Sequence, residues 1–277
     1  MPDVSGTVPL LKLHDATVYR GKNKILENFS VSVGPGEHTA IIGPNGSGKS
    51  TLIQLLTRQL YPVAHENGQP ALQVFGKSRW KLEELRKHIG IVSSQLQYEI
   101  SHNLRRGRIS GRDVVLSGCF SSMQLFNHQT ITDEMQSGAD RALALMEAEY
   151  LADQHFNKMS AGEARRILIA RALVTDPEIL ILDEPTTALD FVARKNCLNL
   201  IRNIAQSDRT VILVTHHIQE IFPEIEHVLL LKDGNIAYQG IKDQVLTSKN
   251  LSAVFDHPLT LHQNGERYRV EPKEESK

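Results

Sequence analysis

Short apolar runs, separated by glycine-rich or polar segments, set the pattern of the chain. EILILDEP (178–185) and TVILVTHH (210–217) are rich in branched aliphatic residues and apolar over most of their length. Strands that are buried on both faces of a parallel sheet have this composition, because neither face meets water. HTAIIG (38–43) and HIGIVSS (88–94) predict further strands, the first of which runs into a glycine-rich loop. Together these runs predict an α/β fold with a mostly parallel core sheet.

The two ends of the chain follow other periods. LLKLHDATVYR (10–20) alternates loosely between apolar and polar positions, as an exposed antiparallel strand does. HVLLLKDGNIAYQG (227–240) predicts a hairpin that turns at Asp233-Gly234, since this dipeptide favours two-residue turns. From Gln263 the chain is polar and charged, and we expect a disordered tail there.

Composition narrows the class of protein without naming a function. The chain has 277 residues, with a formal net charge of −1, so no strong basic field indicates nucleic acid as a partner. Its two cysteines, Cys119 and Cys197, are far apart and suggest neither a disulfide framework nor a metal knuckle. There is no apolar stretch of membrane-spanning length and no signal pattern, which predicts a soluble, cytoplasmic chain.

GPNGSGKST, from Gly43 to Thr51, is the first motif that carries chemistry. It matches G-x-x-x-x-G-K-[ST] and lies between a predicted strand and the predicted helix KSTLIQLLTRQL (49–60). Glycines allow successive backbone N–H groups to turn inward and surround phosphate oxygens. In this setting Lys49 reaches the β- and γ-phosphates of a nucleotide and Ser50 can ligate Mg²⁺.

Asp183 and Glu184 follow the buried strand of ILILDEP. A carboxylate at the end of such a strand lies beside the phosphate loop, where Asp183 can hold Mg²⁺ directly or through water. Glu184 is then the natural general base for a water that attacks the γ-phosphate. The alternative is a pair of carboxylates that only caps the next helix.

His216 and His217 end the strand of VILVTHH. Neighbouring strand residues point to opposite faces, so we expect one of the two imidazoles to lie beside the phosphates and assign that place to His216. His217 is expected to be peripheral.

KMSAGEARRIL, from Lys158, has two interpretations. Ser160 followed by Glu163 predicts a capping box at a helix start, which requires no function. A helix N-terminus is also a receptor for anions, which would make this stretch a second phosphate site.

The order of these motifs resembles that of the ATPase subunits of ABC transporters, over roughly residues 10–245. The matching stretches are GPNGSGKST, MSAGE, ILILDEP, TALD and VTHH. The resemblance implies a P-loop NTPase of ABC type with an N-terminal antiparallel β subdomain and an inserted helical subdomain at about residues 98–160. Residues 246–277 would then be a C-terminal helix and the disordered tail.

The resemblance also implies the cofactors, the partners and the roles of single residues. ATP and Mg²⁺ would be bound, Tyr19 would stack on adenine, and the signature MSAGE would act on ATP held by a second copy, in a homodimer. The alternative for Tyr19 is a half-buried strand tyrosine. A separate multi-span membrane subunit is the other implied partner, with this chain at the cytoplasmic face. The nucleotide-binding residues are Tyr19, Gly43, Pro44, Asn45, Gly46, Ser47, Gly48, Lys49, Ser50 and Thr51; the catalytic residues are Glu184 and His216; the signature is Ser160, Ala161, Gly162 and Glu163; the D-loop residue is Asp190; the Mg²⁺ ligands are Ser50, Asp183 and Gln95.

Two departures from the family pattern matter. The signature usually reads Leu-Ser-Gly-Gly-Gln, so Glu163 places a negative charge near a nucleotide unless it folds back onto the Ser160 N–H. In IGIVSSQ, Ser94 occupies the place of the expected glutamine and Gln95 comes one residue later. A one-residue shift at a strand end reverses the direction of a side chain, so either residue could fill this role.

Some alternatives remain open at this stage. The arginines of NLRRGRISGRD (103–113) form either a solvated loop or a contact with an acidic partner or lipid headgroups. An ABC-type ATPase in cofactor assembly, or a regulator that binds ATP without transport, shares the motifs. A small GTPase would need an Asn-Lys-x-Asp segment, which the chain lacks.

Overall fold

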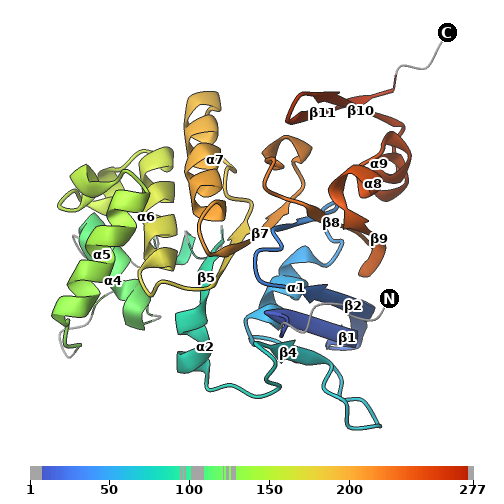
Figure 1. The fold of residues 1–277 in the computed structure, drawn as a ribbon, viewed down its shortest axis with the longest axis horizontal. Helices are drawn as coiled ribbons and strands as arrows, with labels where there is room; N and C mark the ends of the chain where they lie inside the picture. The colour runs from blue at the N-terminus through green and yellow to red at the C-terminus, as the bar shows by residue number, and fades with distance from the viewer. Residues whose placement is uncertain are drawn as a thin grey trace. The chain divides into compact units, whose positions relative to one another are not determined.

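The computed structural model describes residues 8–93, 96, 98–100, 109–120, 122, 125 and 129–273. The chain divides into two compact units: unit 1 comprises residues 1–81 and 212–277, and unit 2 comprises residues 82–211. Unit 1 therefore combines the two ends of the chain, drawn in blue and in orange to red (Figure 1).

An antiparallel sheet of unit 1 contains β1 (Leu11–Arg20), β2 (Asn23–Val33) and β4 (Leu72–Val74), in the order β2-β1-β4. The antiparallel strand predicted near the N-terminus is thus confirmed. Alternate apolar positions of β1 are buried, which explains the loose alternation in the sequence. Asp15 in β1 and Asn28 in β2 have positive φ values of 44° and 45°, and the β1–β2 register is irregular there, so both strands bend in mid-course.

Parallel strands form the centre of unit 1. β3 (Thr39–Ile42) lies between β7 (Thr210–Thr215) and β8 (His227–Lys232), parallel to both, and every residue of β3 is buried. β9 (Asn235–Ile241) runs antiparallel to β8. The predicted turn joins them, with φ values of 48° at Asp233 and 76° at Gly234, both in the left-handed region that a tight hairpin turn requires.

The C-terminal segment of unit 1 differs from expectation. It contains α8 (Lys242–Val245), α9 (Ser248–Phe255), β10 (Leu259–Asn264) and β11 (Arg267–Pro272). The helix was predicted, but the prediction of a disordered tail from Gln263 is wrong up to Pro272, because β10 and β11 pair as an antiparallel hairpin. Its polar sequence conceals one buried aromatic residue, Tyr268, which is 5% exposed.

The described residues of unit 2 include a parallel strand pair and several α-helices. β5 (Ile89–Val92) pairs with β6 (Ile179–Asp183), and all but the last residue of β6 are buried. α4, α5 and α6 pack on one another, and α4 and α5 lie within the predicted helical subdomain (Figure 1). Five α-helices have described bounds in unit 2: α2 (Leu82–His88), α4 (Gly111–Ser117), α5 (Asp133–Leu145), α6 (Ala161–Leu173) and α7 (Phe191–Ala205).

The parallel pairings of both units confirm an α/β fold with a mostly parallel core sheet. In the described part of the chain, no helix has both the length and the hydropathy that crossing a membrane requires.

Candidate nucleotide-binding and hydrolysis site

The glycine loop joins β3 to α1 (Lys49–Leu56), as the sequence predicts. Gly48 has a φ of 102°, and a Cβ atom there would lie 2.7 Å from the Leu26 side chain. At Gly43 a Cβ atom would lie 2.5 Å from the backbone oxygen of Leu231. Both positions therefore require glycine, one for its conformation and both for lack of space.

Lys49 is buried and spans the loop. Its Nζ atom donates to the backbone oxygens of Gly43, at 2.7 Å, and Pro44, at 2.9 Å. Ser47 is also buried, at 2% exposed, and its Oγ atom has no hydrogen-bond partner among the described residues. A buried hydroxyl without a partner is costly, so Ser47 is suited to a polar ligand atom that enters the loop.

The N-terminus of α1 differs from those of the other longer helices. It has no side-chain cap and no acidic residue in its first turn. The positive end of the helix dipole therefore faces the loop without a capping side chain or an acidic first-turn residue beside it. Oxygen side chains do cap other helices of the described chain, namely α4, α5, α6, α7 and α9, through Ser110, Thr132, Ser160, Asp190 and Thr247.

In unit 2, Asp183 and Glu184 mark the end of β6. Asp183 is the first partly exposed residue of that strand. Glu184 has a φ of 50°, and its carboxylate accepts a hydrogen bond of 3.2 Å from the Thr187 hydroxyl. A positive φ in a glutamate costs about 1–3 kcal/mol and is retained where the surroundings or a function require it.

The helix-cap alternative for these two carboxylates is wrong. The next helix, α7, begins at Phe191, and its cap is Asp190, whose Oδ1 accepts from the Ala193 N–H at 2.8 Å. Neither Asp183 nor Glu184 therefore caps α7, while Asp190 has a structural role at the helix start.

His216 and His217 follow β7, which ends at Thr215. Their ring centroids are 3.9 Å apart, so the expectation that they point to opposite faces is wrong. The reason is that both residues lie beyond the last paired residue, where strand alternation no longer applies. The Thr215 hydroxyl accepts from the His217 N–H at 2.9 Å, which fixes the turn.

The signature in unit 2 forms the predicted capping box at the start of α6. The Ser160 N–H donates to Glu163 Oε2 at 2.8 Å, and the Glu163 N–H donates to Ser160 Oγ at 3.3 Å. The Ser160 hydroxyl also donates to Glu163 Oε2, at 2.8 Å. The backbone N–H of Ser160, followed by its hydroxyl, lowers the pKa of Glu163, which therefore stays ionised.

Glu163 is thus folded back onto the helix, as the sequence predicts. The first-turn N–H groups of Ala161 and Gly162 have no partner in the described structure. They are the donors that α6 can still offer to an anion. Gly162 also lies against α7, since a Cβ atom there would be 3.2 Å from that of Ala193.

The structure describes only some of the remaining predicted residues. Tyr19 is 47% exposed near the end of β1, opposite Lys24 of β2, so its ring has an open face. Gln95 and Ser94, the candidates for the Q-loop position, lie outside the described residues, as do Arg105, Arg106 and Arg108 of the basic stretch.

The donors available for Mg²⁺ are oxygens. Ser50 presents an exposed hydroxyl in unit 1 and Asp183 a partly exposed carboxylate in unit 2. In the described part of the chain, no group of three or more His, Cys, Asp or Glu side chains could hold a metal ion. Mg²⁺ generally binds through one or two protein oxygens and completes its shell with phosphate oxygens and water, so the chemistry of Ser50 and Asp183 is of the kind that it prefers.

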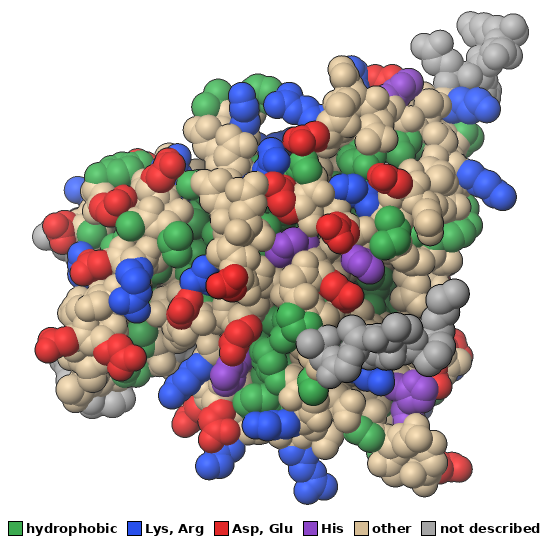
Figure 2. Space-filling view, in the orientation of Figure 1, with side chains coloured by type: hydrophobic (Ala, Val, Ile, Leu, Met, Phe, Trp, Pro, Cys, Tyr) green, Lys and Arg blue, Asp and Glu red, His purple; other side chains and the backbone are tan. Residues whose placement is uncertain are grey.

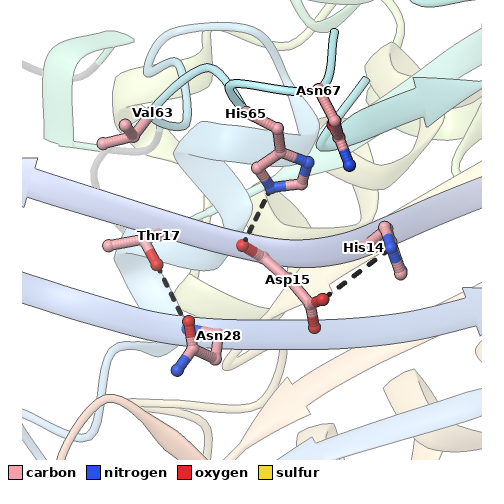
Figure 3. Close-up of a pocket in the computed structure, with 7 residues that line it drawn as sticks. All are labelled: His14, Asp15, Thr17, Asn28, Val63, His65 and Asn67. Atoms are coloured by element: carbon pink, nitrogen blue, oxygen red, sulfur yellow. Dashed lines mark hydrogen bonds and ion pairs between the residues drawn. The ribbon is translucent and has the colours of Figure 1, made fainter. Parts of the chain in front are cut away.

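A separate hollow of about 340 Å³ lies on β1 and β2 of unit 1 (Figure 3). His65 Nε2 lies 3.2 Å from the backbone oxygen of Asp15, and the Asp15 carboxylate accepts from the Ser30 hydroxyl. None of the predicted site residues line it. On the face shown in Figure 2, basic and acidic side chains are interspersed.

Comparisons with known proteins show the family of the chain. The family model described as ABC transporter matches residues 26–187. YlmA of Bacillus subtilis, an ABC transporter ATP-binding protein, is 36% identical over 95% of this chain and 98% of its own length.

Solved structures share the fold. CbiO1 of Clostridium perfringens, part of the ABC transporter complex CbiONQ, has a TM-score of 0.71 and 28% identity over 88% of this chain and 93% of its own. The dimeric cassette MJ0796 has a TM-score of 0.65 and 27% identity over 83% of this chain and 98% of its own. The glycine loop, the carboxylates after β6 and the signature helix thus occur in a chain that belongs to the ABC transporter family, as an ATP-binding subunit.

Proposed function

We propose that this chain is the ATP-hydrolysing subunit of a transporter, and that it works as a pair and drives a separate multi-span membrane subunit. The observation that carries the proposal is the N-terminus of α1: an uncapped helix behind a glycine loop, with a buried lysine and a buried serine hydroxyl without a partner. This combination suits the phosphates of a nucleotide better than any purely structural role.

The phosphate loop, Tyr19, the two carboxylates and His216 then have separate tasks. Residues 43–51 bind the phosphates, Tyr19 stacks on adenine, and Ser50 with Asp183 is suited to hold Mg²⁺, whose charge would offset that of the phosphates when bound. Glu184 orients and deprotonates the attacking water, and His216 stabilises the γ-phosphate of the bound ATP. Because phosphoryl transfer proceeds through a loose transition state, these groups act mainly by positioning and charge neutralisation.

A second copy completes the site. In the proposed homodimer, the N–H groups of Ala161 and Gly162 and the Ser160 side chain approach the γ-phosphate that the other copy holds. The dimeric cassette of similar fold supports a pair of this kind. ATP would join the two copies and hydrolysis would release them, which gives a chain at the cytoplasmic face a way to move a membrane partner.

The decisive experiment on hydrolysis is Glu184→Gln. We expect the variant to bind ATP normally and to form a stable ATP-dependent dimer. Its rate of ATP hydrolysis should be lower by about 10²-fold or more, since it loses a general base. Glu83→Gln is the matched control, because Glu83 is an exposed residue of α2 in the same unit. Turnover by Glu184→Gln at the rate of the control would remove Glu184 from the mechanism.

Coupling to transport needs a different measurement. We expect a multi-span protein to co-purify with the full chain from detergent-solubilised membranes. If the chain is recovered without such a partner while its ATPase activity is intact, the transport proposal fails and an ABC-type ATPase with another task remains.

A further inference from the structure

The C-terminal hairpin lies against the segment that follows His216. β11 packs on the short 3₁₀ helix η5 (Ile218–Glu220). Figure 1 shows β10 and β11 in dark red beyond α8 and α9. Both hairpin and η5 belong to unit 1, and the hairpin lies outside residues 26–187, which the family model matches.

The hairpin is anchored to α9 by two serines. The Leu259 N–H donates to Ser252 Oγ at 2.9 Å, and the Leu261 N–H donates to Ser248 Oγ at 2.9 Å. An isolated two-stranded hairpin is marginal in water, so contacts of this kind are needed to hold β10 in one place.

Tyr268 anchors β11 to α8. Its side chain is buried, and its hydroxyl donates to Asp243 Oδ1 of α8 at 3.2 Å. Burial, followed by the charge of Asp243, raises the pKa of Tyr268 to about 12. The phenol therefore keeps its proton at neutral pH and remains a donor.

The segment under β11 leads directly to His216. η5 begins two residues after it, and Ile218 and Glu220 of η5 are 4% and 1% exposed. The backbone oxygen of His217 accepts from the Glu220 N–H at 3.1 Å. His216 thus lies in a short connection between the end of β7 and η5, so a shift of η5 shifts the histidine.

We propose that the hairpin positions His216: Tyr268 holds β11 on η5, and η5 holds His216 where its side chain meets the γ-phosphate. The inference rests on the proposed function, because it assigns Tyr268 a role through His216. Tyr268 is a positioning residue and touches no nucleotide. Loss of its side chain impairs the chemical step and leaves nucleotide binding intact, since the phosphates are bound by residues 43–51.

The test is a double-mutant cycle of Tyr268→Ala and His216→Ala in the whole chain. Steady-state kinetics measure ATP hydrolysis, and calorimetry measures ATP binding. Tyr268→Ala should lower kcat about tenfold, within the range of up to ~10² expected for a displacement of ~1 Å at a catalytic group, with KM and ATP affinity unchanged. In the His216→Ala background the same substitution should lower kcat no further, because two residues that act through one group are not additive. Tyr268→Phe, which keeps the packing, should recover most of the activity.

Leu72→Ala in β4 is the control for stability, since Leu72 is a buried residue of the same unit at 2% exposed. It should lower the melting temperature without changing kcat. If Tyr268→Ala does not fold, Ser252→Ala, which removes one anchor of β10, serves in the same cycle.

The outcomes separate the inference from the proposed function. A folded Tyr268→Ala protein with normal kcat, or an effect that multiplies with that of His216→Ala, overturns the inference and leaves the proposed function in place. A normal kcat for His216→Ala alone removes the histidine from the mechanism and the hairpin's role with it.

Discussion

The N-termini of α1 and α6 are the two phosphate-binding helix ends that the sequence predicts, and they are built differently. α1 starts at a glycine, without a side-chain cap or an acidic residue in its first turn. α6 starts at Ser160, which exchanges hydrogen bonds with Glu163. Each N-terminus is the positive end of its own helix dipole, but in α6 the protein's own carboxylate occupies part of that end.

This difference separates the two roles. α1 has neither a side-chain cap nor an acidic residue in its first turn, so it suits the primary phosphate site. α6 is complete without a ligand, and its remaining donors are the N–H groups of Ala161 and Gly162. Such a helix can stay folded while it gains and loses contact with a nucleotide held by another copy.

The largest effect should come from Lys49→Met, which removes the charged side chain at the N-terminus of α1. The substitution removes a charge that reaches the β- and γ-phosphates, so both ATP binding and hydrolysis should fall, hydrolysis by about 10²–10³-fold. Isothermal titration and a phosphate-release assay measure the two quantities. Lys12→Met, at an exposed position of β1, should change neither; normal ATP affinity in Lys49→Met would contradict the assignment.

Ser160→Arg, which changes the N-cap of α6, should affect ATP hydrolysis selectively. The larger cationic side chain should obstruct the approach of the second copy, so hydrolysis falls about 10²-fold or more while ATP binding to the monomer is unchanged. The same two assays apply. Ser137→Arg, an exposed position of α5, is the matched control. If Ser160→Arg hydrolyses ATP normally, the stretch is only a helix start.

The smallest effect concerns Glu163. Its pKa lies below the usual value of 4.5 in the folded protein, so its contribution to stability is fully present above pH 4.5 and is lost as the pH falls through the lowered pKa. Because the carboxylate is near the surface, we expect less than about 1 kcal/mol. Urea unfolding of the wild type and Glu163→Gln should differ at pH 7 and converge at low pH.

The rate of ATP hydrolysis by Glu163→Gln tests whether the carboxylate at the N-terminus of α6 acts on the nucleotide. Glutamine is the residue usual in the family signature, and the folded-back carboxylate does not reach the phosphate, so turnover should stay within about threefold of wild type. A large gain in turnover would mean that the charge of Glu163 acts on the nucleotide despite the capping box.

Local patterns predicted the parts of the site that depend on nearby residues. The glycine loop, the hairpin at Asp233-Gly234 and the capping box all involve residues within a few positions of one another, so their chemistry is legible in the sequence. The apolar runs likewise predicted the buried strands, because parallel strands must bury both faces.

The errors have a common cause. His216 and His217 were expected on opposite faces because the strand was assumed to include them, yet pairing ends at Thr215. The polar sequence of the tail predicts disorder, yet Tyr268 anchors β11 to α8, and Ser248 and Ser252 of α9 accept hydrogen bonds from β10. Neither the end of pairing nor such an anchor is visible from the residues of one segment alone.

The sequence by itself therefore determined the chemistry of this protein: a phosphate loop, two carboxylates after a buried strand and a self-capped signature helix. Tertiary structure alone decided that Asp190 and not Glu184 caps α7, that the two histidine rings lie together, and that a polar C-terminal hairpin covers η5. The physical reason is that motifs are set by bonds between near neighbours, whereas these three features depend on where distant segments stop pairing and what they pack against.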